Sequence, residues 1–289
     1  MKIKGLWLAA GILGVSGAIL KRVAEAGADA VITKSLGMIP REGYPTPIIA
    51  SFDNSLINAV GLTNPGIHNF IGEIKIAKEG QKPVIVSIFG SDEEEFAKIA
   101  KIAENAGADA IELNVSCPHA KVSQIGQSAE LTYEVTKAVK SKIQIPVIVK
   151  LTPNVTDIVE IAQAAEEAGA DAITAINTIK AIAIDIYLKK PILGNKFGGL
   201  SGPAIFPIAL RNVYDIYENI NIPIIGSGGV TDWKTAIAMH LAGASAIQIG
   251  TALLDGLDIF ERIKSGIKEY LSKEGFRDVS EIVGLAHKK

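Results

Sequence analysis

The pentapeptide Ala26-Gly-Ala-Asp-Ala30 recurs at 106–110 and 168–172, and again as Ala242-Gly-Ala-Ser-Ala246. Each copy follows a stretch with helical periodicity and precedes a short apolar run such as AVIT or AIELNV. Glycine is typical of the residue that follows a helix, where the backbone turns left-handed, and the next Asp or Ser leads the chain into a strand. The copies are unevenly spaced, so they indicate a repeated helix–strand corner around a parallel sheet rather than a solenoid.

Other strands are expected where apolar, β-branched runs begin after a proline, at Val84–Phe89, Val147–Leu151 and Ile224–Gly226. These runs are continuous rather than alternating, which is typical of strands buried on both faces. With a first strand at Leu6–Ala10, the expected strands start near Leu6, Ala30, Val84, Ala110, Val147, Ala172, Ile224 and Ala246. Eight strands predict an α/β fold of the (β/α)8 TIM-barrel type, with residues 1–289 as a single domain. A doubly wound open sheet is the alternative.

Two segments break the strand–helix rhythm. Ser35–Asn64 and Thr178–Pro203 are rich in Pro and Gly, and both follow expected strands. They are therefore expected at the C-terminal face of the barrel, where enzymes of this fold keep their chemistry, as rim insertions forming a lid or antiparallel strands.

Composition excludes several classes of protein. The 289 residues carry 29 Lys+Arg and 31 Asp+Glu, a net charge of −2, so no nucleic-acid surface is indicated. Cys117 is the single cysteine, so an internal disulfide and a Cys-based zinc or iron–sulfur site are excluded, and no metal site is expected. Glycines interrupt the apolar N-terminal stretch, which favours a buried strand over a signal peptide, and no membrane span is expected. The chain is expected to be cytoplasmic.

Glycine-rich strand ends predict a phosphate site. Gly226–Val230 and Gln248–Ala252 follow the last two strands, where TIM barrels offer backbone N–H groups to phosphate. Gly199–Pro203 adds a third candidate backbone contact. The glycines could serve turn geometry alone, but we prefer the interpretation that they bind a ligand that carries a phosphate.

Reactive and charged side chains are expected at the same rim. Asn114 and Cys117 lie at a strand end and in the loop that follows it, where a thiolate could act as a nucleophile or as a base. Lys34 and Lys150 each close a strand, and a buried ammonium there needs an anion. Amides such as Asn177 suit a planar, imide-like ring.

Six motifs in this order resemble one family: NVSCP (114–118), KLTPNV (150–155), AINT (175–178), GGLSGPA (198–204), GSGGV (226–230) and QIGTALL (248–254). Together they resemble class 1 dihydroorotate dehydrogenase over nearly the whole chain. TKSLGMIPREGYPTP (33–47) and NAVGLTNPG (58–66) are most similar to the catalytic subunit of class 1B. Cysteine in NVSCP fits the soluble classes, because membrane-bound class 2 enzymes carry serine there.

The resemblance implies FMN-dependent oxidation of dihydroorotate to orotate in the de novo synthesis of UMP. Cys117 would be the general base that takes the C5 proton while the C6 hydride passes to FMN. The resemblance also implies a homodimer core of a heterotetramer. Its electron-transfer subunit would carry an iron–sulfur cluster, with FAD left open.

Site residues follow position by position from the same resemblance. FMN would contact Ala10, Lys34, Ser35, Ser87, Asn114, Lys150, Ile176, Gly202, Gly228, Gly229, Gly250 and Thr251. Dihydroorotate would contact Lys34, Asn58, Ala59, Val60, Gly61, Leu62, Asn114, Asn177 and Thr178.

Three positions depart from the family pattern: Ser87 replaces an Asn, Ala10 a Ser, and His119 an Asn. The CysProHis sequence is similar to that of dihydropyrimidine dehydrogenases, so a flavoenzyme of that kind is one alternative. A barrel lyase that uses Lys150 to form a Schiff base is another.

Overall fold

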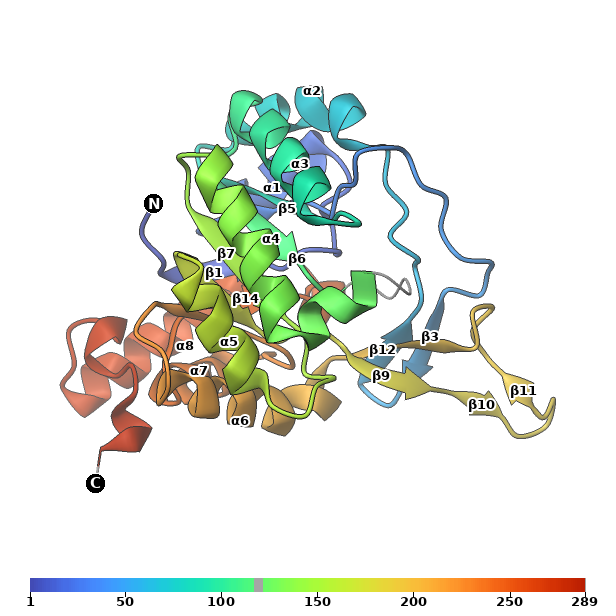
Figure 1. Ribbon diagram of the computed structural model, residues 1–289. Helices are drawn as coiled ribbons and strands as arrows, with labels where there is room; N and C mark the ends of the chain where they lie inside the picture. The colour runs from blue at the N-terminus through green and yellow to red at the C-terminus, as the bar shows by residue number, and fades with distance from the viewer. Residues whose placement is uncertain (117–121, 289) are drawn as a thin grey trace.

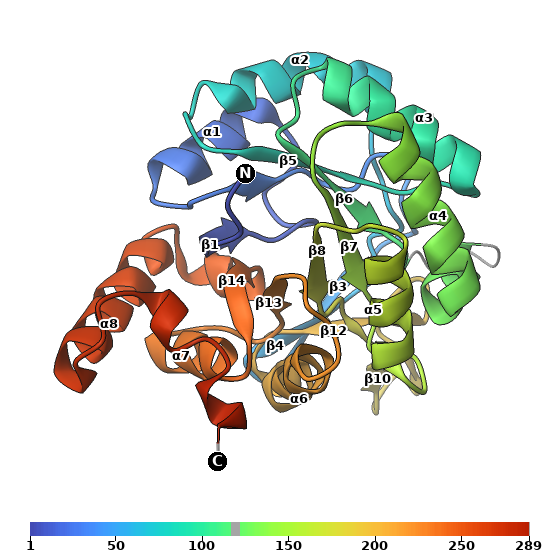
Figure 2. The same ribbon diagram turned by 60° about the vertical axis from the view of Figure 1, so that its left-hand side comes forward.

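A closed barrel of eight parallel strands forms the centre of the chain (Figure 2). The computed structural model describes residues 1–116 and 122–288. The barrel strands are β1 (Gly5–Leu8), β2 (Val31–Ile32), β5 (Val84–Ile88), β6 (Ala110–Asn114), β7 (Val147–Leu151), β8 (Ala172–Ala175), β13 (Ile224–Ser227) and β14 (Ala244–Ile249). They pair in the order β1-β14-β13-β8-β7-β6-β5-β2, and a parallel bridge between Trp7 and Ala30 joins the two ends. The TIM barrel expected from the sequence is confirmed.

Helices follow the strands and cover the outside of the barrel (Figures 1 and 2). They are α1 (Gly17–Glu25), α2 (Ile67–Lys78), α3 (Glu93–Asn105), α4 (Ala129–Lys142), α5 (Ile158–Glu167), α6 (Phe206–Tyr217), α7 (Trp233–Leu241) and α8 (Ile259–Glu274). Short 3₁₀ turns are η1 (Val122–Gln127), η2 (Pro203–Ile205), η3 (Thr251–Asp255), η4 (Val279–Glu281) and η5 (Leu285–His287). Among the described residues, none of these helices is both long and apolar enough to cross a membrane.

The repeated pentapeptide forms the corner between a helix and the next strand. Gly107 has φ +98°, and its N–H donates to the carbonyl of Glu104 while the Ala108 N–H donates to that of Ala103. This pair of hydrogen bonds is the Schellman motif, which requires a residue with positive φ and so favours glycine. The predicted role of the pentapeptide glycine is therefore confirmed here.

The aspartate of the pentapeptide does more than turn the chain. Asp109 Oδ2 accepts a hydrogen bond of 2.7 Å from the backbone N–H of Val84, at the start of the neighbouring strand. The same contact recurs from Leu6 to Asp29 and from Val147 to Asp171. Each carboxylate thus ties a corner to the adjacent strand at the N-terminal end of the barrel.

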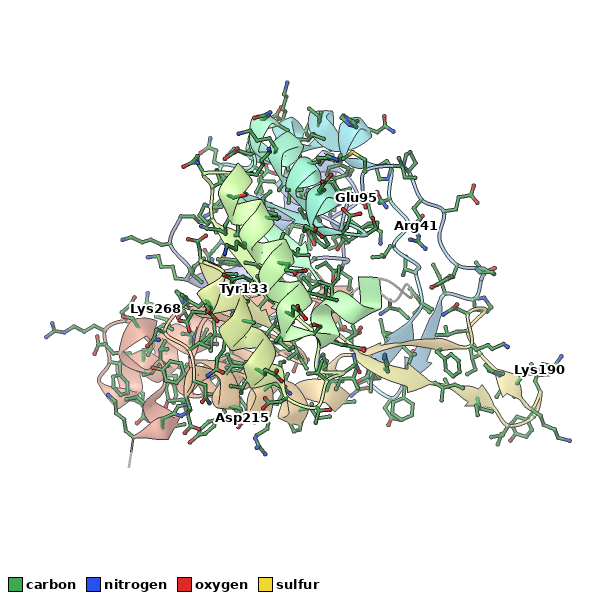
Figure 3. The ribbon with its side chains drawn as sticks, viewed as in Figure 1. Arg41, Glu95, Tyr133, Lys190, Asp215 and Lys268 are labelled. Carbon is green, nitrogen blue, oxygen red and sulfur yellow. The ribbon has the colours of Figure 1, made fainter. Side chains whose placement is uncertain are left out.

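Both rim insertions form antiparallel strands at the other end, as expected. β3 (Ile49–Phe52), β4 (Ser55–Asn58), β12 (Phe197–Ser201) and β9 (Ile179–Ile182) form one sheet in the order β3-β4-β12-β9. A hairpin of β10 (Ile184–Asp185) and β11 (Lys190–Pro191) projects beyond this sheet (Figure 1). Figure 3 shows Lys190 pointing away from the barrel at this hairpin.

The inside of the barrel changes from apolar to polar along its axis. Trp7, Ile85 and Ile148 belong to a fully buried apolar cluster within the strands. Side chains alternate along a strand, so the next inward position lies two residues further toward the C-terminal rim. On six strands that position is polar and buried: Ser87, Glu112, Lys150, Thr174, Ser227 and Gln248. Glu112, Lys150, Thr174 and Gln248 are joined in one group by hydrogen bonds. The rim end of the barrel therefore has a polar floor.

Candidate active site

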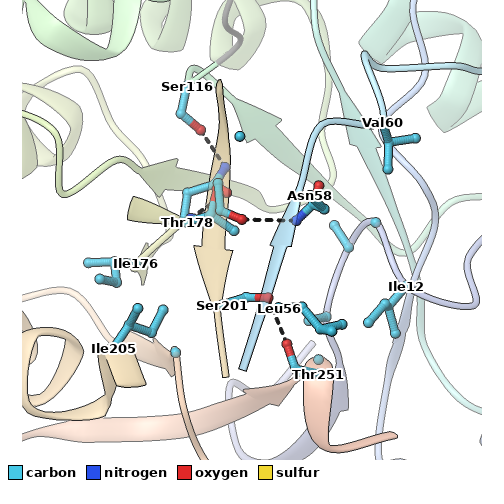
Figure 4. Close-up of a pocket in the computed structure, with 18 of the residues that line it drawn as sticks. Ile12, Leu56, Asn58, Val60, Ser116, Ile176, Thr178, Ser201, Ile205 and Thr251 are labelled. Atoms are coloured by element: carbon cyan, nitrogen blue, oxygen red, sulfur yellow. Dashed lines mark hydrogen bonds between the residues drawn. The ribbon is translucent and has the colours of Figure 1, made fainter. Parts of the chain in front are cut away.

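A large cavity of about 950 Å³ opens at the C-terminal rim, above the polar floor. Its size lies near the upper end of the range for small-molecule and cofactor sites. The ends of the barrel strands form one wall, and the antiparallel rim sheet forms the other (Figure 4). The position is the one that the sequence predicts for the chemistry of a TIM barrel.

One end of the cavity is lined by backbone amides. Gly228 and Gly229 follow β13 with φ of +122° and +74°, and Thr251 begins η3 after β14. Within the described residues, the N–H groups of these three residues have no hydrogen-bond acceptor. A Cβ on Gly229 would lie 2.7–2.8 Å from atoms of Phe206, so only glycine lets the loop pack against α6. Unpaired amides on a tight glycine turn are suited to bind a phosphate.

The floor of the cavity carries a buried cation. Lys150 at the end of β7 is 5% exposed, and its Nζ donates a hydrogen bond of 2.9 Å to Gln248 Oε1. The carboxylate of Glu112 lies beneath, with Oε1 3.8 Å from the same Nζ. Lys150 therefore presents its positive charge to the cavity from a fixed position.

An amide and hydroxyl cluster lies beside Lys150. Asn114 at the end of β6 donates to Ser35 Oγ at 3.0 Å and accepts from Ser116 Oγ at 2.8 Å. Asn177, which follows β8, donates to Asn114 Oδ1 at 3.2 Å and also to Ser116 Oγ. On the rim sheet, Asn58 donates to the carbonyl of Gly199 at 3.3 Å (Figure 4). These groups can both donate to and accept from a planar polar ring.

A second cation lines the cavity at the end of β2. Lys34 is half-buried, and burial lowers the pKa of its amine from the ordinary 10.5. No ion-pair partner for Lys34 occurs in residues 1–116 or 122–288. A partly desolvated ammonium without a counter-ion is suited to bind an anionic ligand.

The structure brings nearly all of the predicted site residues together. The cavity is lined by Ala10, Lys34, Ser35, Asn58, Ala59, Val60, Gly61, Leu62, Asn114, Lys150, Ile176, Asn177, Thr178, Gly202, Gly228, Gly229, Gly250 and Thr251. Ser87 does not line the cavity: it is fully buried, and its Oγ lies 2.9 Å from Ser35 Oγ. It therefore supports Ser35 from behind. Cys117 and His119 lie outside the described residues.

Sequence reasoning missed several polar residues of the site. Asn154 accepts from the Lys180 N–H at 2.9 Å and donates to the Thr178 carbonyl at 3.0 Å, so it holds the segment after β8. Glu112 and Gln248 form the floor. Their signal was a polar residue within an otherwise apolar strand sequence, which does not by itself tell whether the side chain points into the barrel.

Comparison with known proteins gives consistent matches. The family model described as "Dihydroorotate dehydrogenase" matches residues 3–271. The chain is 55% identical to a Pyrococcus abyssi protein named dihydroorotate dehydrogenase B (NAD(+)), catalytic subunit, over 98% of this chain and 95% of that protein. A Thermoplasma volcanium protein of the same name is 49% identical over 98% of this chain and 94% of its own length.

The fold has a close counterpart among solved structures. The crystal structure of DHODH from Eimeria tenella in complex with ferulenol superposes with a TM-score of 0.86 at 23% identity, covering 98% of this chain and 85% of that one. The sequence matches confirm the resemblance drawn from the motifs, including its B form. The chain belongs to the dihydroorotate dehydrogenase family.

Proposed function

We propose that this chain oxidises dihydroorotate to orotate in de novo pyrimidine synthesis, with FMN as its bound cofactor. The observation that carries the proposal is the cavity itself, which joins a cradle of unpaired amides, a buried lysine and an amide cluster. It occurs in a chain more than half identical, over nearly its full length, to a protein named as the catalytic subunit of dihydroorotate dehydrogenase B. The same family membership argues against the lyase and the dihydropyrimidine dehydrogenase alternatives.

FMN fits the chemistry of the cavity at both of its ends. The amides of Gly228, Gly229 and Thr251 would hold the phosphate, with Gly202 and Gly250 nearby. Lys150 would lie against the polar end of the flavin ring, where its charge stabilises negative charge. When bound, FMN accepts a hydride from substrate carbon and so supplies the redox chemistry that amino-acid side chains lack.

Dihydroorotate fits the remaining space, because its carboxylate and its imide-like ring need different partners. Lys34 would pair with the carboxylate, and the pairing would compensate its desolvation. The amides of Asn58, Asn114 and Asn177 would donate to and accept from the ring. Together they would hold the ring in one orientation over the flavin.

Cys117 is proposed as the general base that takes the C5 proton. The residue before it, Ser116, lines the cavity and bonds to Asn114, so the chain reaches the site immediately before Cys117. The thiolate would take the proton as the hydride leaves C6, which balances loss of two hydrogens from the substrate. Because Cys117 lies outside the described residues, this role rests on the sequence motif.

Oxidation of dihydroorotate requires a final acceptor for its two electrons. We propose a partner subunit with an iron–sulfur cluster, with FAD left open, and NAD as final acceptor; the relatives' name, a catalytic subunit of an NAD(+) enzyme, supports this. The apolar side chains of Ile186, Tyr187 and Leu188 are 70–87% exposed on the β10–β11 hairpin, which supports assembly through this surface, as in a homodimer core of a heterotetramer. A cytoplasmic location and a single domain over residues 1–289 stay predictions.

The test is direct reduction of the bound flavin. Purified protein should be yellow, and anaerobic mixing with dihydroorotate should bleach the flavin. Cys117→Ser should keep FMN and slow bleaching by about 10²–10⁴-fold, the usual contribution of a general base. A flavin that dihydroorotate leaves oxidised would refute the proposed function, whereas bleaching at the normal rate in Cys117→Ser would remove only that residue from the chemistry.

A further inference from the structure

Four buried polar side chains form one network under the cavity. Glu112, Thr174, Gln248 and Lys150 are 0%, 0%, 1% and 5% exposed, on β6, β8, β14 and β7. Only Lys150 and Gln248 line the cavity, so Glu112 lies one side chain below it. The resemblance to the family assigns no role to Glu112.

The hydrogen bonds of the network have a defined direction. Gln248 Nε2 donates to Glu112 Oε2 at 2.6 Å, and Gln248 Oε1 accepts from Lys150 Nζ at 2.9 Å. Thr174 Oγ1 donates to the same Glu112 oxygen at 3.1 Å. The carboxylate thereby fixes which end of the Gln248 amide faces Lys150, and Gln248 in turn holds the lysine.

The second carboxylate oxygen has no hydrogen bond. Glu112 Oε1 is buried without a partner in the described part of the chain, and it lies 3.8 Å from Lys150 Nζ. A buried carboxylate oxygen that accepts no hydrogen bond is unfavourable unless a positive charge lies close to it. Lys150 is the cation that the geometry provides, so the two charges offset each other beneath the cavity.

We propose that Glu112 is a positioning residue that limits how much of the Lys150 charge reaches the flavin, and so sets the preference of the site between oxidised and reduced FMN. The inference rests on the proposed function, because it takes FMN as the ligand. A reduced flavin carries more negative charge than an oxidised one. An unopposed lysine would favour the reduced form, and a nearby carboxylate weakens that preference.

The experiment compares the midpoint potential of bound FMN in the wild type and in Glu112→Gln, by chemical reduction with dithionite against a reference dye. Removing the negative charge should favour reduced FMN by about tenfold, an upward shift of about 30 mV for a two-electron couple. Lys150→Met should shift the potential downward. Thr174→Val removes the hydrogen bond that Thr174 donates to Glu112 and the one that it accepts from Gln248, but no charge. It should leave the potential near the wild-type value.

The outcomes separate this inference from the proposed function. An unmoved potential in Glu112→Gln, or an equal shift in Thr174→Val, would overturn the role of Glu112. Dihydroorotate takes no part in this measurement, so a flavin that it fails to reduce contradicts only the proposed function. Protein that binds no FMN would overturn both.

A second measurement decides the matter where Glu112→Gln does not fold. Infrared difference spectra of the wild type would be recorded on reduction of FMN, with the Glu112 band assigned by Glu112→Asp. An ionised carboxylate band that shifts on reduction supports the proposal. A protonated carboxyl band would overturn it, because a neutral group cannot offset Lys150.

Discussion

Substitutions in the glycine turn after β13 allow effects on protein stability to be distinguished from effects on FMN binding. Gly229→Ala places a Cβ 2.7–2.8 Å from Phe206 Cβ, Cα and N, at a φ of +74°. Strain at positive φ costs about 1–2 kcal/mol, and overpacking against α6 about 1–3 kcal/mol more. We therefore expect the free energy of unfolding to fall by about 2–5 kcal/mol.

The same substitution should weaken FMN binding, because the loop can relieve the clash only by moving. Amides that bind a phosphate contribute about 1.5–3 kcal/mol each. Loss of the two from Gly228 and Gly229 then lowers the affinity by about two to four orders of magnitude. Flavin fluorescence titration measures the affinity, and urea denaturation of the FMN-free protein measures stability.

Two matched variants test the reasoning. Gly107→Ala has a φ of +98° but no atom within 4 Å of the new Cβ, so it should lose only about 1–2 kcal/mol of stability and bind FMN normally. At Gly250 the Cβ would meet only Ala9 Cβ, at 3.6 Å, an ordinary contact. Gly250→Ala should therefore keep its stability. Because Gly250 lines the cavity at the proposed phosphate site, the new methyl group should block close approach of the phosphate and lower FMN affinity. Normal FMN binding by both Gly229→Ala and Gly250→Ala would refute the phosphate cradle.

Three further predictions concern other parts of the molecule. Lys34→Met should raise the thermal stability of the ligand-free protein at neutral pH, because it removes a partly buried ammonium whose pKa is lowered by desolvation. The same variant should raise KM for dihydroorotate. An unchanged KM would contradict the contact between Lys34 and the substrate carboxylate. Burial lowers the pKa of His240 from 6.5 to about 4, so as pH falls between these values the unfolded chain takes up a proton that the folded one does not. The protein should lose about 3 kcal/mol of stability over that range, and His240→Gln should lose less, in urea titrations at each pH. Leu188→Ser should weaken self-association in sedimentation experiments while FMN binding stays normal.

Much of the fold could be predicted because its signals are local. A strand buried on both faces is a continuous apolar run, and a Schellman corner requires glycine, so both are visible in a few neighbouring residues. Strand ends were less certain. The first strand, expected over Leu6–Ala10, ends at Leu8, because the chain leaves the sheet as the rim begins.

The site residues that directly follow a strand could also be predicted from the sequence. Gly228 and Gly250 follow strands directly, so their position at the rim follows from the strand count. Ser87 was expected at the cofactor, but it packs behind Ser35 instead. Its place depends on how one strand is staggered against the next, which is a property of the closed barrel and not of the segment around Ser87.

The polar floor could not have been predicted from one strand, yet its position argues for function. Replacing a buried ion pair such as Glu112 and Lys150 by apolar side chains is often neutral or stabilising. This chain fills the interior with apolar side chains such as Ile85 and Ile148 one level lower, and places charge at the level that meets the cavity. A buried ion pair at the level that meets the cavity is better explained by the charge it sets beneath a ligand than by any contribution to stability.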